Sequence, residues 1–415
     1  MWTKAVDIYS VQLIRTKSEI FLGVGALGRL HEIAEKWKEQ NISKVFILAG
    51  KHAFYKSGAE KEVMESLKEE GLSVTVYDRI TGKITDTLLD EAVSCGRSAG
   101  VQAVLAVGGG SIIDAGKCIA LLLAENEEVK MADLIENTFV PEKILPYAVI
   151  NTSHGSGSEN NPFAIVSFPA KKETHLISSD LFYPRQVICD PVLTVTLPRH
   201  PTRYSAMDAV NHAVESVVDK ENNPMSIFLA YEIIKLVSRY LPLVEKDPGN
   251  LSGRYFLLFA SLLAGWASDN RKEHFSHVLV HALHTLKPDL PHGLGVSVLM
   301  PSVVKKVYPE HGKVLAAVLS PIVSDLSGNA EEAEDAANGV ESWISGCGVR
   351  LDPADALFLK ENIDEFVETS YQNTSLSLLL TVSPLESSRE AIRSIFDDAL
   401  TPDRTEKRGE REKED

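Results

Sequence analysis

The sequence predicts an α/β domain with a mainly parallel sheet over residues 1–198, an all-helical domain over residues 199–400, and a charged, disordered tail over residues 401–415. Two observations support this division. Up to about residue 198, short β-rich runs alternate with amphipathic segments, the pattern of a parallel sheet covered by helices on both faces. Beyond it, long segments with a 3.6-residue apolar period dominate.

Four strands are predicted in the first domain, because runs of β-branched and large apolar residues are bounded there by turn formers. They are KVFILAG (44–50), SVTVYDRI (73–80), AVLAVGGG (103–110) and YAVINT (147–152). Three further short runs, AIVSF, THLISS and QVICD, are expected to form a hairpin or an edge of the same sheet. Segments between the strands, such as AEKEVMESLKEEG, carry apolar residues at helical spacing and end on glycine, which favours helices.

The helices of the second domain are predicted from long apolar-periodic segments: YSAMDAVNHAVESVV, SIFLAYEIIKLVSRYL, YFLLFASLLAGWA, FSHVLVHALHTL and GVSVLMPSVVKKVY. The boundary near LPRHPT contains two prolines and is expected to be a hinge over a cleft, where small-molecule sites commonly form. The last fifteen residues, TPDRTEKRGEREKED, contain no apolar anchor, which is typical of a disordered tail.

Composition narrows the class of protein. The 415 residues carry a net charge of −16, which argues against nucleic acid or an anionic membrane as the main partner. The longest apolar run, near residues 255–267, is too short to span a bilayer, and MWTKAVDIYS does not resemble a secretory signal. The four cysteines are scattered without disulfide or zinc spacing. We therefore expect a cytoplasmic protein with reduced thiols.

A glycine-rich turn joins a strand to a helix in AVLAVGGGSIIDAGK (103–117). Gly108, Gly109 and Gly110 allow a sharp turn and let a pyrophosphate approach bare N–H groups at the positive end of the helix. Ser111 and Asp114 stand at S-x-x-D spacing and are expected to cap that helix. The turn favours a Rossmann-like, dinucleotide-binding domain. The alternative is a turn that merely links strand and helix, because such units are common.

A second glycine-rich loop, NTSHGSGSENN (151–161), follows the strand YAVI. Its hydroxyls and bare amides are suited to lining a cofactor groove. A flexible linker has a similar composition, so this loop by itself does not decide between the two interpretations.

Five of the twelve histidines fall within residues 274–292. His277, His281 and His284 stand at i, i+4 and i+7 and project from one side of a predicted helix, and His292 follows in a PHG turn. A single histidine in an apolar helix is usually a core residue. A cluster this dense instead favours a metal site.

Asp208 and His212 lie one turn apart in MDAVNHAVE. A D-x-x-x-H pair alone is more often surface hydrogen bonding. One carboxylate combined with several neutral imidazoles, however, suits a divalent metal such as Fe²⁺ or Zn²⁺. Three or four protein ligands would leave a position open for a substrate oxygen.

Together these motifs resemble the iron-containing (group III) alcohol dehydrogenases, a branch of the dehydroquinate-synthase-like fold. The resemblance covers about residues 17–400 and follows FLGVGALGRL, GGGSIIDAGK, TSHGSGSE, DPVLTVTLP, MDAVNHAVE and HVLVHALHTLKPDLPHG in order. The resemblance implies a pyrophosphate loop, two hydroxyls in the cofactor cleft, four metal ligands and a histidine beside the nicotinamide. By this resemblance the pyrophosphate loop is Gly108, Gly109, Gly110 and Ser111, and the two hydroxyls are those of Thr152 and Ser153. The implied metal ligands are Asp208, His212, His277 and His292, and the histidine beside the nicotinamide is His281.

The chain departs from the family pattern in the second glycine loop. Where the family usually has Pro-Thr-Thr-Ala, this sequence has Asn151, Thr152, Ser153 and His154, which places a bulky, titratable group in the loop. The stretch before PHG is one residue longer than usual. Aligning the H-x-x-x-H pair on His277 and His281 needs only that extra residue, which favours His277 as the third ligand.

The expected activity is metal-dependent hydride transfer between a nicotinamide dinucleotide and a small alcohol or aldehyde, with His281 relaying the proton. A glycerol-type polyol dehydrogenase is an alternative within this class. A dehydroquinate-synthase-like lyase would require several basic residues near the metal, and residues 204–215 and 274–295 show no such cluster. A non-catalytic dinucleotide-binding module would lack some of the metal-ligating residues, whereas all four proposed positions carry residues that can bind a metal in this chain.

Cofactor preference is predicted from the turn after the first strand. An NAD-selective enzyme would be expected to carry a carboxylate there for the ribose hydroxyls. The turn instead reads Gly50, Lys51 and His52, with a cation available for a 2′-phosphate, so we expect Gly50 and Lys51 to bind the cofactor and NADP to be preferred over NAD. We also expect a homo-oligomer, a dimer, with no nucleic-acid or membrane partner.

Overall fold

The computed structural model describes residues 9, 12–50, 53–125, 129–136, 139–171, 173–218, 222–270, 275–372, 384 and 388–400. The predicted tail over residues 401–415 lies outside this part of the chain. The chain divides into two compact units. The sheet unit comprises Met1–Val210 and Lys235–Asn270, and the helical unit comprises Asn211–Ile234 and Arg271–Asp415. The division falls within one continuous helix, α7 (Arg199–Val218), which we treat as a single element.

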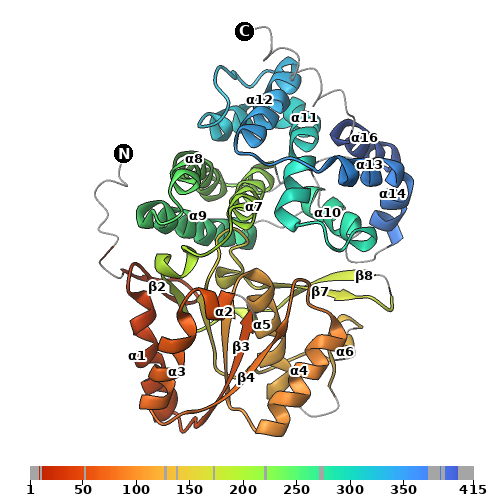
Figure 1. Cartoon of the computed structure of the whole chain (residues 1–415). Coiled ribbons are helices and arrows are strands. Elements are labelled where there is room, and N and C mark those ends of the chain that lie inside the picture. The colour runs from red at the N-terminus through yellow and green to blue at the C-terminus, as the bar shows by residue number, and fades with distance from the viewer. Residues whose placement is uncertain are drawn as a thin grey trace. The chain divides into compact units, whose positions relative to one another are not determined.

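The sheet unit is built on a seven-stranded sheet (Figure 1). In spatial order its strands are β1 (Gln12–Arg15), β2 (Glu19–Leu22), β9 (Gln186–Cys189), β6 (Tyr147–Asn151), β5 (Ala103–Gly108), β3 (Lys44–Gly50) and β4 (Ser73–Ile80). All neighbours pair in parallel except β1 and β2. The predicted α/β class with a mainly parallel sheet is confirmed.

Of the three short predicted strands after β6, two form a separate hairpin and one joins the main sheet. β7 (Phe163–Phe168) and β8 (Glu173–Ser178) form an antiparallel hairpin that is a sheet of its own. QVICD does not form an edge, because β9 lies between β2 and β6 and is buried along its whole length. A short strand of mostly apolar residues is typical of such an interior position. The edge on this side of the sheet is β1, which pairs with β2, and neither strand was among those predicted.

Helices cover both faces of the sheet, as the alternating pattern predicts. They are α1 (Leu30–Glu39), α2 (Ala53–Lys56), α3 (Ala59–Glu69), α4 (Asp86–Ala99), α5 (Gly110–Ala124) and α6 (Met131–Ile135). Figure 1 shows α1 and α3 on one side of the sheet and α4 and α6 on the other. Apolar residues of α1 and α3 share one core with Val45 and Ile47 of β3. On the opposite face, Gly96 of α4 leaves room for the ring of Phe46.

The strand order creates a crevice at one end of the sheet. β3 has β4 on one side and β5 on the other, so the connections that follow β3 and β4 run to opposite sides of β3. In an open parallel sheet, ligands bind outside the carboxyl ends of strands at such a topological switch point. The turns after β3 and β5 begin at Gly50 and Gly108, which are two of the predicted cofactor residues.

The described residues from 199 onward are mostly helical, as predicted. Besides α7, its helices are α8 (Pro224–Lys246), α9 (Leu251–Asn270), α10 (Phe275–Leu286), α11 (His292–Leu319), α12 (Ala333–Gly346), α13 (Pro353–Glu361), α14 (Ile363–Gln372) and α16 (Arg389–Ala399). Single 3₁₀ turns occur at Ala26–Arg29, Ser158–Asn160, Asp180–Phe182, Pro191–Thr194 and Ala330–Glu332. Among the described residues, no helix is long and apolar enough to cross a bilayer.

α10 and α11 are the two helices that carry the histidine cluster. Residues 275–284 of α10 are all buried, so its three histidines face the protein interior and not solvent. α11 starts at His292 because Pro291 is extended, with φ −60° and ψ 133°. A Cβ on Gly295 would lie 2.4 Å from Val280, so this glycine lets the first turn of α11 pack closely against α10.

Candidate nucleotide pocket and metal centre

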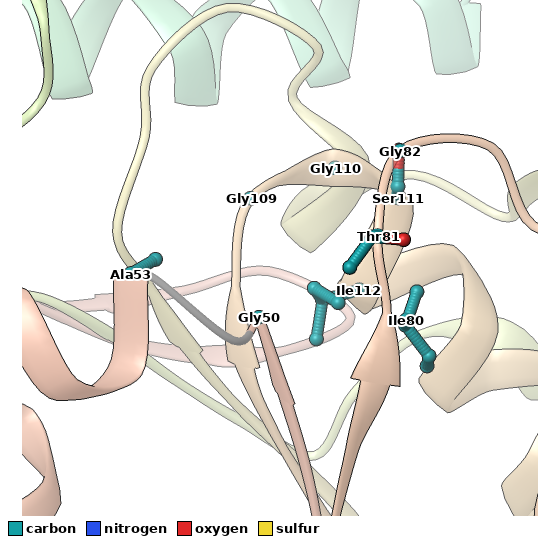
Figure 2. Close-up of a pocket in the computed structure, with 9 residues that line it drawn as sticks. All are labelled: Gly50, Ala53, Ile80, Thr81, Gly82, Gly109, Gly110, Ser111 and Ile112. Atoms are coloured by element: carbon teal, nitrogen blue, oxygen red, sulfur yellow. The ribbon is translucent and has the colours of Figure 1, made fainter.

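A cavity of about 330 Å³ lies at the switch point of the sheet unit. It is lined by Gly50, Ala53, Ile80, Thr81, Gly82, Gly109, Gly110, Ser111 and Ile112. Figure 2 shows Gly50 at the end of β3, Thr81 and Gly82 after β4, and Gly109 and Gly110 after β5 around this cavity. Four of the predicted cofactor residues, Gly50, Gly109, Gly110 and Ser111, therefore line one cavity, and the first turn of α5 presents backbone N–H groups there.

The three glycines of the turn after β5 are each required by close packing. A Cβ on Gly108 would lie 2.5 Å from Ile112. On Gly109 and Gly110 it would lie 2.7 Å from the hydroxyls of Ser153 and Ser156, respectively. Any side chain here would collide with α5 or with the second glycine loop. The bare backbone seen in the sequence is therefore a packing requirement, and it leaves the amide groups of the turn accessible to an anion.

The second glycine loop is a fixed part of the structure and not a flexible linker. The Thr152 amide donates to the Gly108 carbonyl at 3.1 Å, which joins the two glycine loops. The amides of Gly155 and Gly157 both donate to Ser261 Oγ of α9, at 2.8 and 3.3 Å. Thr152 and Ser153 are absent from the residues that line the described cavity, so their predicted cofactor contacts stay a prediction.

Neither Ser111 nor Asp114 caps α5, so this sequence prediction is wrong. The cap residue is Gly109, which has no side chain, and Asp114 lies in the second turn. The Asp114 carboxylate instead accepts from the Ser158 hydroxyl and from the Ile165 amide at 3.0 Å. Asp114 thereby joins α5 to the end of the second glycine loop and to β7. This contact is long-range, so S-x-x-D spacing could not reveal it.

Lys117 is a buried cation that the sequence analysis did not single out. Its Nζ donates to Ser158 Oγ at 2.9 Å, to Asn161 Oδ1 at 3.1 Å and to the Phe163 carbonyl at 2.6 Å. Burial lowers its pKa to about 8, while the nearby Asp114 carboxylate acts in the opposite direction. Through these three hydrogen bonds Lys117 holds residues 158–163 against α5.

His154, the departure from the family pattern, is buried and neutral. Burial and the nearby Arg254 cation lower its pKa to about 3. Its Nδ1 lies 3.4 Å from Ser205 Oγ. The predicted titratable group is therefore held in one protonation state at neutral pH.

The remaining predicted cofactor residue, Lys51, lies outside the described residues, as does His52. Ile80, Thr81 and Gly82 were missed, although the Thr-Gly turn after SVTVYDRI marks the carboxyl end of a strand.

The predicted metal ligands lie on α7, α10 and α11. The ligand atoms of Asp208, His277 and His292 all lie within 4.8 Å of one another. Asp208 and His277 are 6% and 2% exposed. One buried carboxylate and two imidazoles form a donor set that fits a divalent ion of borderline character.

His212, the fourth predicted ligand, lies beside this group but does not belong to it. Its ring stacks on that of His277, with centroids 4.3 Å apart and planes 16° apart. The ring is buried, and it is carried by the same face of α7 as Asp208, one turn away. The role of His212 as a fourth ligand therefore stays a prediction.

Glu215 is a site residue that the sequence analysis missed. Its Oε2 lies 2.8 Å from Nδ1 of His277, and its Oε1 accepts from the Ser276 amide at 2.5 Å. A carboxylate at this distance accepts a hydrogen bond from Nδ1–H, which leaves the lone pair of His277 on Nε2. Glu215 also binds backbone N–H groups of the first turn of α10. Its signal was the D-x-x-x-H-x-x-E spacing of Asp208, His212 and Glu215 on α7.

We expect Glu215→Gln to lower divalent-metal affinity by about 10–100-fold, the usual effect of losing the hydrogen-bond partner of a metal-binding histidine. The amide cannot hold His277 in the Nε2-binding tautomer as a carboxylate does. Fe²⁺ titration of the chelated variant measures the effect, with Glu310→Gln, an exposed change on α11, as the control. Unchanged Fe²⁺ affinity in Glu215→Gln would show that the contact is structural only.

His281 and His284 complete the histidine cluster. Their ligand atoms lie within 4.8 Å of each other and of a ligand atom of His292, in a second group without a carboxylate. His281 is 6% exposed and stands one turn after His277 on α10. The structure therefore places the predicted proton-relay residue beside a proposed metal ligand.

Comparison with known proteins assigns nearly the whole chain to one protein family. The model of the iron-containing alcohol dehydrogenase family matches residues 17–191, and that of the C-terminal part of the Fe-containing family matches residues 202–400. The long-chain primary alcohol dehydrogenase AdhA of Thermoanaerobacter ethanolicus is 37% identical over 400 residues, which are 96% of this chain and 100% of that protein.

Two further similar proteins are also alcohol dehydrogenases by name. The NAD-dependent methanol dehydrogenase of Bacillus methanolicus is 27% identical over 83% of this chain and 90% of its own. The crystal structure of NADH-dependent butanol dehydrogenase A from Thermotoga maritima matches with a TM-score of 0.81 and 25% identity over 95% of this chain and 100% of that chain. These comparisons do not favour the lyase or the glycerol-type alternatives. The chain belongs to the iron-containing alcohol dehydrogenase family, metal-dependent oxidoreductases that act on CH–OH groups and use a divalent metal, usually iron, with NAD(P).

Proposed function

We propose that this chain transfers a hydride between NAD(P) and a small alcohol or aldehyde, with Asp208, His212, His277 and His292 as the metal ligands. The observation that carries the proposal is the buried convergence of Asp208, His277 and His292, in which Glu215 orients His277. The donor set combines one anion with neutral imidazoles, which suits Fe²⁺ and also Zn²⁺ or Mn²⁺.

Each group of residues has a separate task in this proposal. Asp208, His212, His277 and His292 would hold a divalent ion, which would supply Lewis acidity toward the oxygen of the bound alcohol or aldehyde. The nicotinamide supplies the hydride acceptor or donor. The amides of Gly109, Gly110 and Ser111 bind the pyrophosphate at the N-terminus of α5. His281 passes the alcohol proton toward solvent, because imidazole exchanges protons near neutral pH.

The experiment that tests this function is an activity screen of the purified, chelated protein after reconstitution with Fe²⁺, Zn²⁺ or Mn²⁺. Alcohols and diols from C2 to C6, longer primary alcohols and their aldehydes serve as substrates, because the relatives are named for long-chain alcohols, methanol and butanol. We expect metal-dependent oxidation with NAD(P). Absence of turnover with every alcohol and metal would contradict the proposal. Sedimentation of the same preparation tests the predicted dimer.

We further propose that NADP is preferred over NAD. None of the nine residues that line the described cavity carries a carboxylate that would accept bonds from the ribose hydroxyls. Lys51 follows Gly50 in sequence and supplies a cation for a 2′-phosphate. We expect kcat/KM for NADPH to exceed that for NADH by about tenfold, equivalent to one charge-assisted contact of roughly 1.4 kcal/mol. Lys51→Ala should remove most of this difference, and a clear NADH preference would contradict the proposal.

A further inference from the structure

Three histidines of the helical unit form a nearly equilateral triangle. The ring centroids of His281 and His284 are 6.1 Å apart, and each lies 5.5 Å from that of His292. Three imidazoles bound to one tetrahedral ion at about 2.0–2.1 Å have centroids roughly 5 Å apart. The three rings are therefore within a small rearrangement of the geometry of a three-histidine metal site.

His284 is held in a tautomer that is competent to bind a metal. Its Nε2 lies 2.9 Å from the carbonyl oxygen of Leu290. A carbonyl oxygen only accepts, so Nε2 carries the hydrogen and Nδ1 keeps the lone pair. A ring N–H donated to a backbone carbonyl is the arrangement that fixes metal-binding histidines in proteins. His284 is 6% exposed, so a surface role does not account for it.

This triangle and the group that contains Asp208 share one residue, His292. One neutral imidazole offers one lone pair, so His292 serves one position at a time. Two nearby dications would also repel each other strongly, with Asp208 as the sole carboxylate in the two groups. The two positions are therefore alternatives for a single ion.

We propose that His281, His284 and His292 form a second, nitrogen-only position for a divalent ion, which competes with the position at Asp208 for His292. Three imidazoles without a carboxylate favour nitrogen-preferring ions such as Zn²⁺ and Ni²⁺, whereas a carboxylate favours harder ions. The position is distinct from the ligand set of the proposed function, since it uses His284 and dispenses with Asp208, His212 and His277.

The consequence for activity rests on the proposed function. An ion at the three-histidine position occupies both His281, the proposed proton relay, and His292, a proposed ligand of the active metal. The enzyme is then inactive, and Zn²⁺ added to the Fe²⁺-loaded protein inhibits it. Binding itself does not depend on this reasoning and is measured separately.

Zn²⁺ binding to the chelated full-length chain tests the position. The variants are Asp208→Asn, His284→Gln and the two combined, with His311→Gln on α11 as the control and thermal unfolding as a check of folding. Glutamine at 284 can still donate an amide N–H to Leu290. We expect each single variant to keep one Zn²⁺ with less than about a tenfold loss of affinity. The double variant should lose more than about 100-fold, since losing a ligand costs at least as much as losing its hydrogen-bond partner.

Two results would overturn the second position. One is loss of Zn²⁺ by Asp208→Asn alone to the level of the double variant, and the other is full Zn²⁺ affinity in the double variant. In the activity arm, His284→Gln should keep Fe²⁺-supported turnover and need at least about ten times more Zn²⁺ for inhibition. If the binding pattern holds and Zn²⁺ does not inhibit the unaltered enzyme, the second position stands and the roles proposed for His281 and His292 are wrong.

Discussion

Replacing Asp208 with alanine is expected to remove bound Fe²⁺ and to lower kcat/KM for alcohol oxidation by about 10³-fold. Asp208 is the only carboxylate in the two metal-binding groups of the described chain, and it is 6% exposed. Its loss leaves the ion with neutral ligands alone. A metal Lewis acid contributes several kcal/mol to stabilising developing charge on the substrate oxygen, and about 4 kcal/mol corresponds to roughly a thousandfold in rate.

The measurement pairs Fe²⁺ content with steady-state kinetics on the purified variant. Asp335→Ala, an exposed change in the first turn of α12, is the matched control and should keep both metal and turnover. Full activity of the Asp208→Ala protein after exhaustive chelation would refute the metal mechanism.

A Gly157→Ala substitution is expected to destabilise the sheet unit by roughly 2–5 kcal/mol, the sum of overpacking and of a left-handed backbone. Gly157 has φ +62°, and a Cβ on it would lie 2.2 Å from the backbone nitrogen of Gly265. Because this nitrogen is part of the backbone of α9, it cannot move aside as a flexible side chain would. The second glycine loop would have to lift from α9, and the hydrogen bonds to Ser261 would be lost.

Gly58→Ala is the matched control for this prediction. Gly58 has φ +81°, but nothing lies within 4 Å of its Cβ position, so only the backbone cost of about 1–2 kcal/mol applies. Denaturant unfolding of both variants gives the comparison. Equal midpoints would show that the close approach of the loop to α9 does not constrain the fold.

Local sequence patterns were sufficient to predict the main elements of this fold. KVFILAG and SVTVYDRI coincide with β3 and β4, because runs rich in β-branched and large apolar residues are bounded there by turn residues. Pairing between distant strands was not predictable in the same way. QVICD lies between β2 and β6, a position decided by contacts with residues far away in the sequence. β1 and β2 are only four residues each, too short for their periodicity to be distinctive.

In the candidate site, too, local spacing was predictable from the sequence and contacts between distant residues were not. Histidine spacing on one helix indicated that His277, His281 and His284 share a face, and the structure places all three in the interior. Contacts between helices were beyond such reasoning. The bond from Glu215 to His277 joins residues 62 positions apart, and Lys117 contacts a loop more than 40 residues away. Their sequence neighbours do not reveal these partners.

The central claim is that His277 binds the active metal and that His281 does not. Fe²⁺ content and turnover of purified His277→Ala and His281→Ala test it most directly. Glu215 orients His277 as a ligand, so His277→Ala should lose both Fe²⁺ and activity. His281→Ala should keep Fe²⁺ and lose turnover, with a changed pH profile, because only the proton relay is removed. Loss of Fe²⁺ from His281→Ala with retention by His277→Ala would contradict the account and reverse the two assignments.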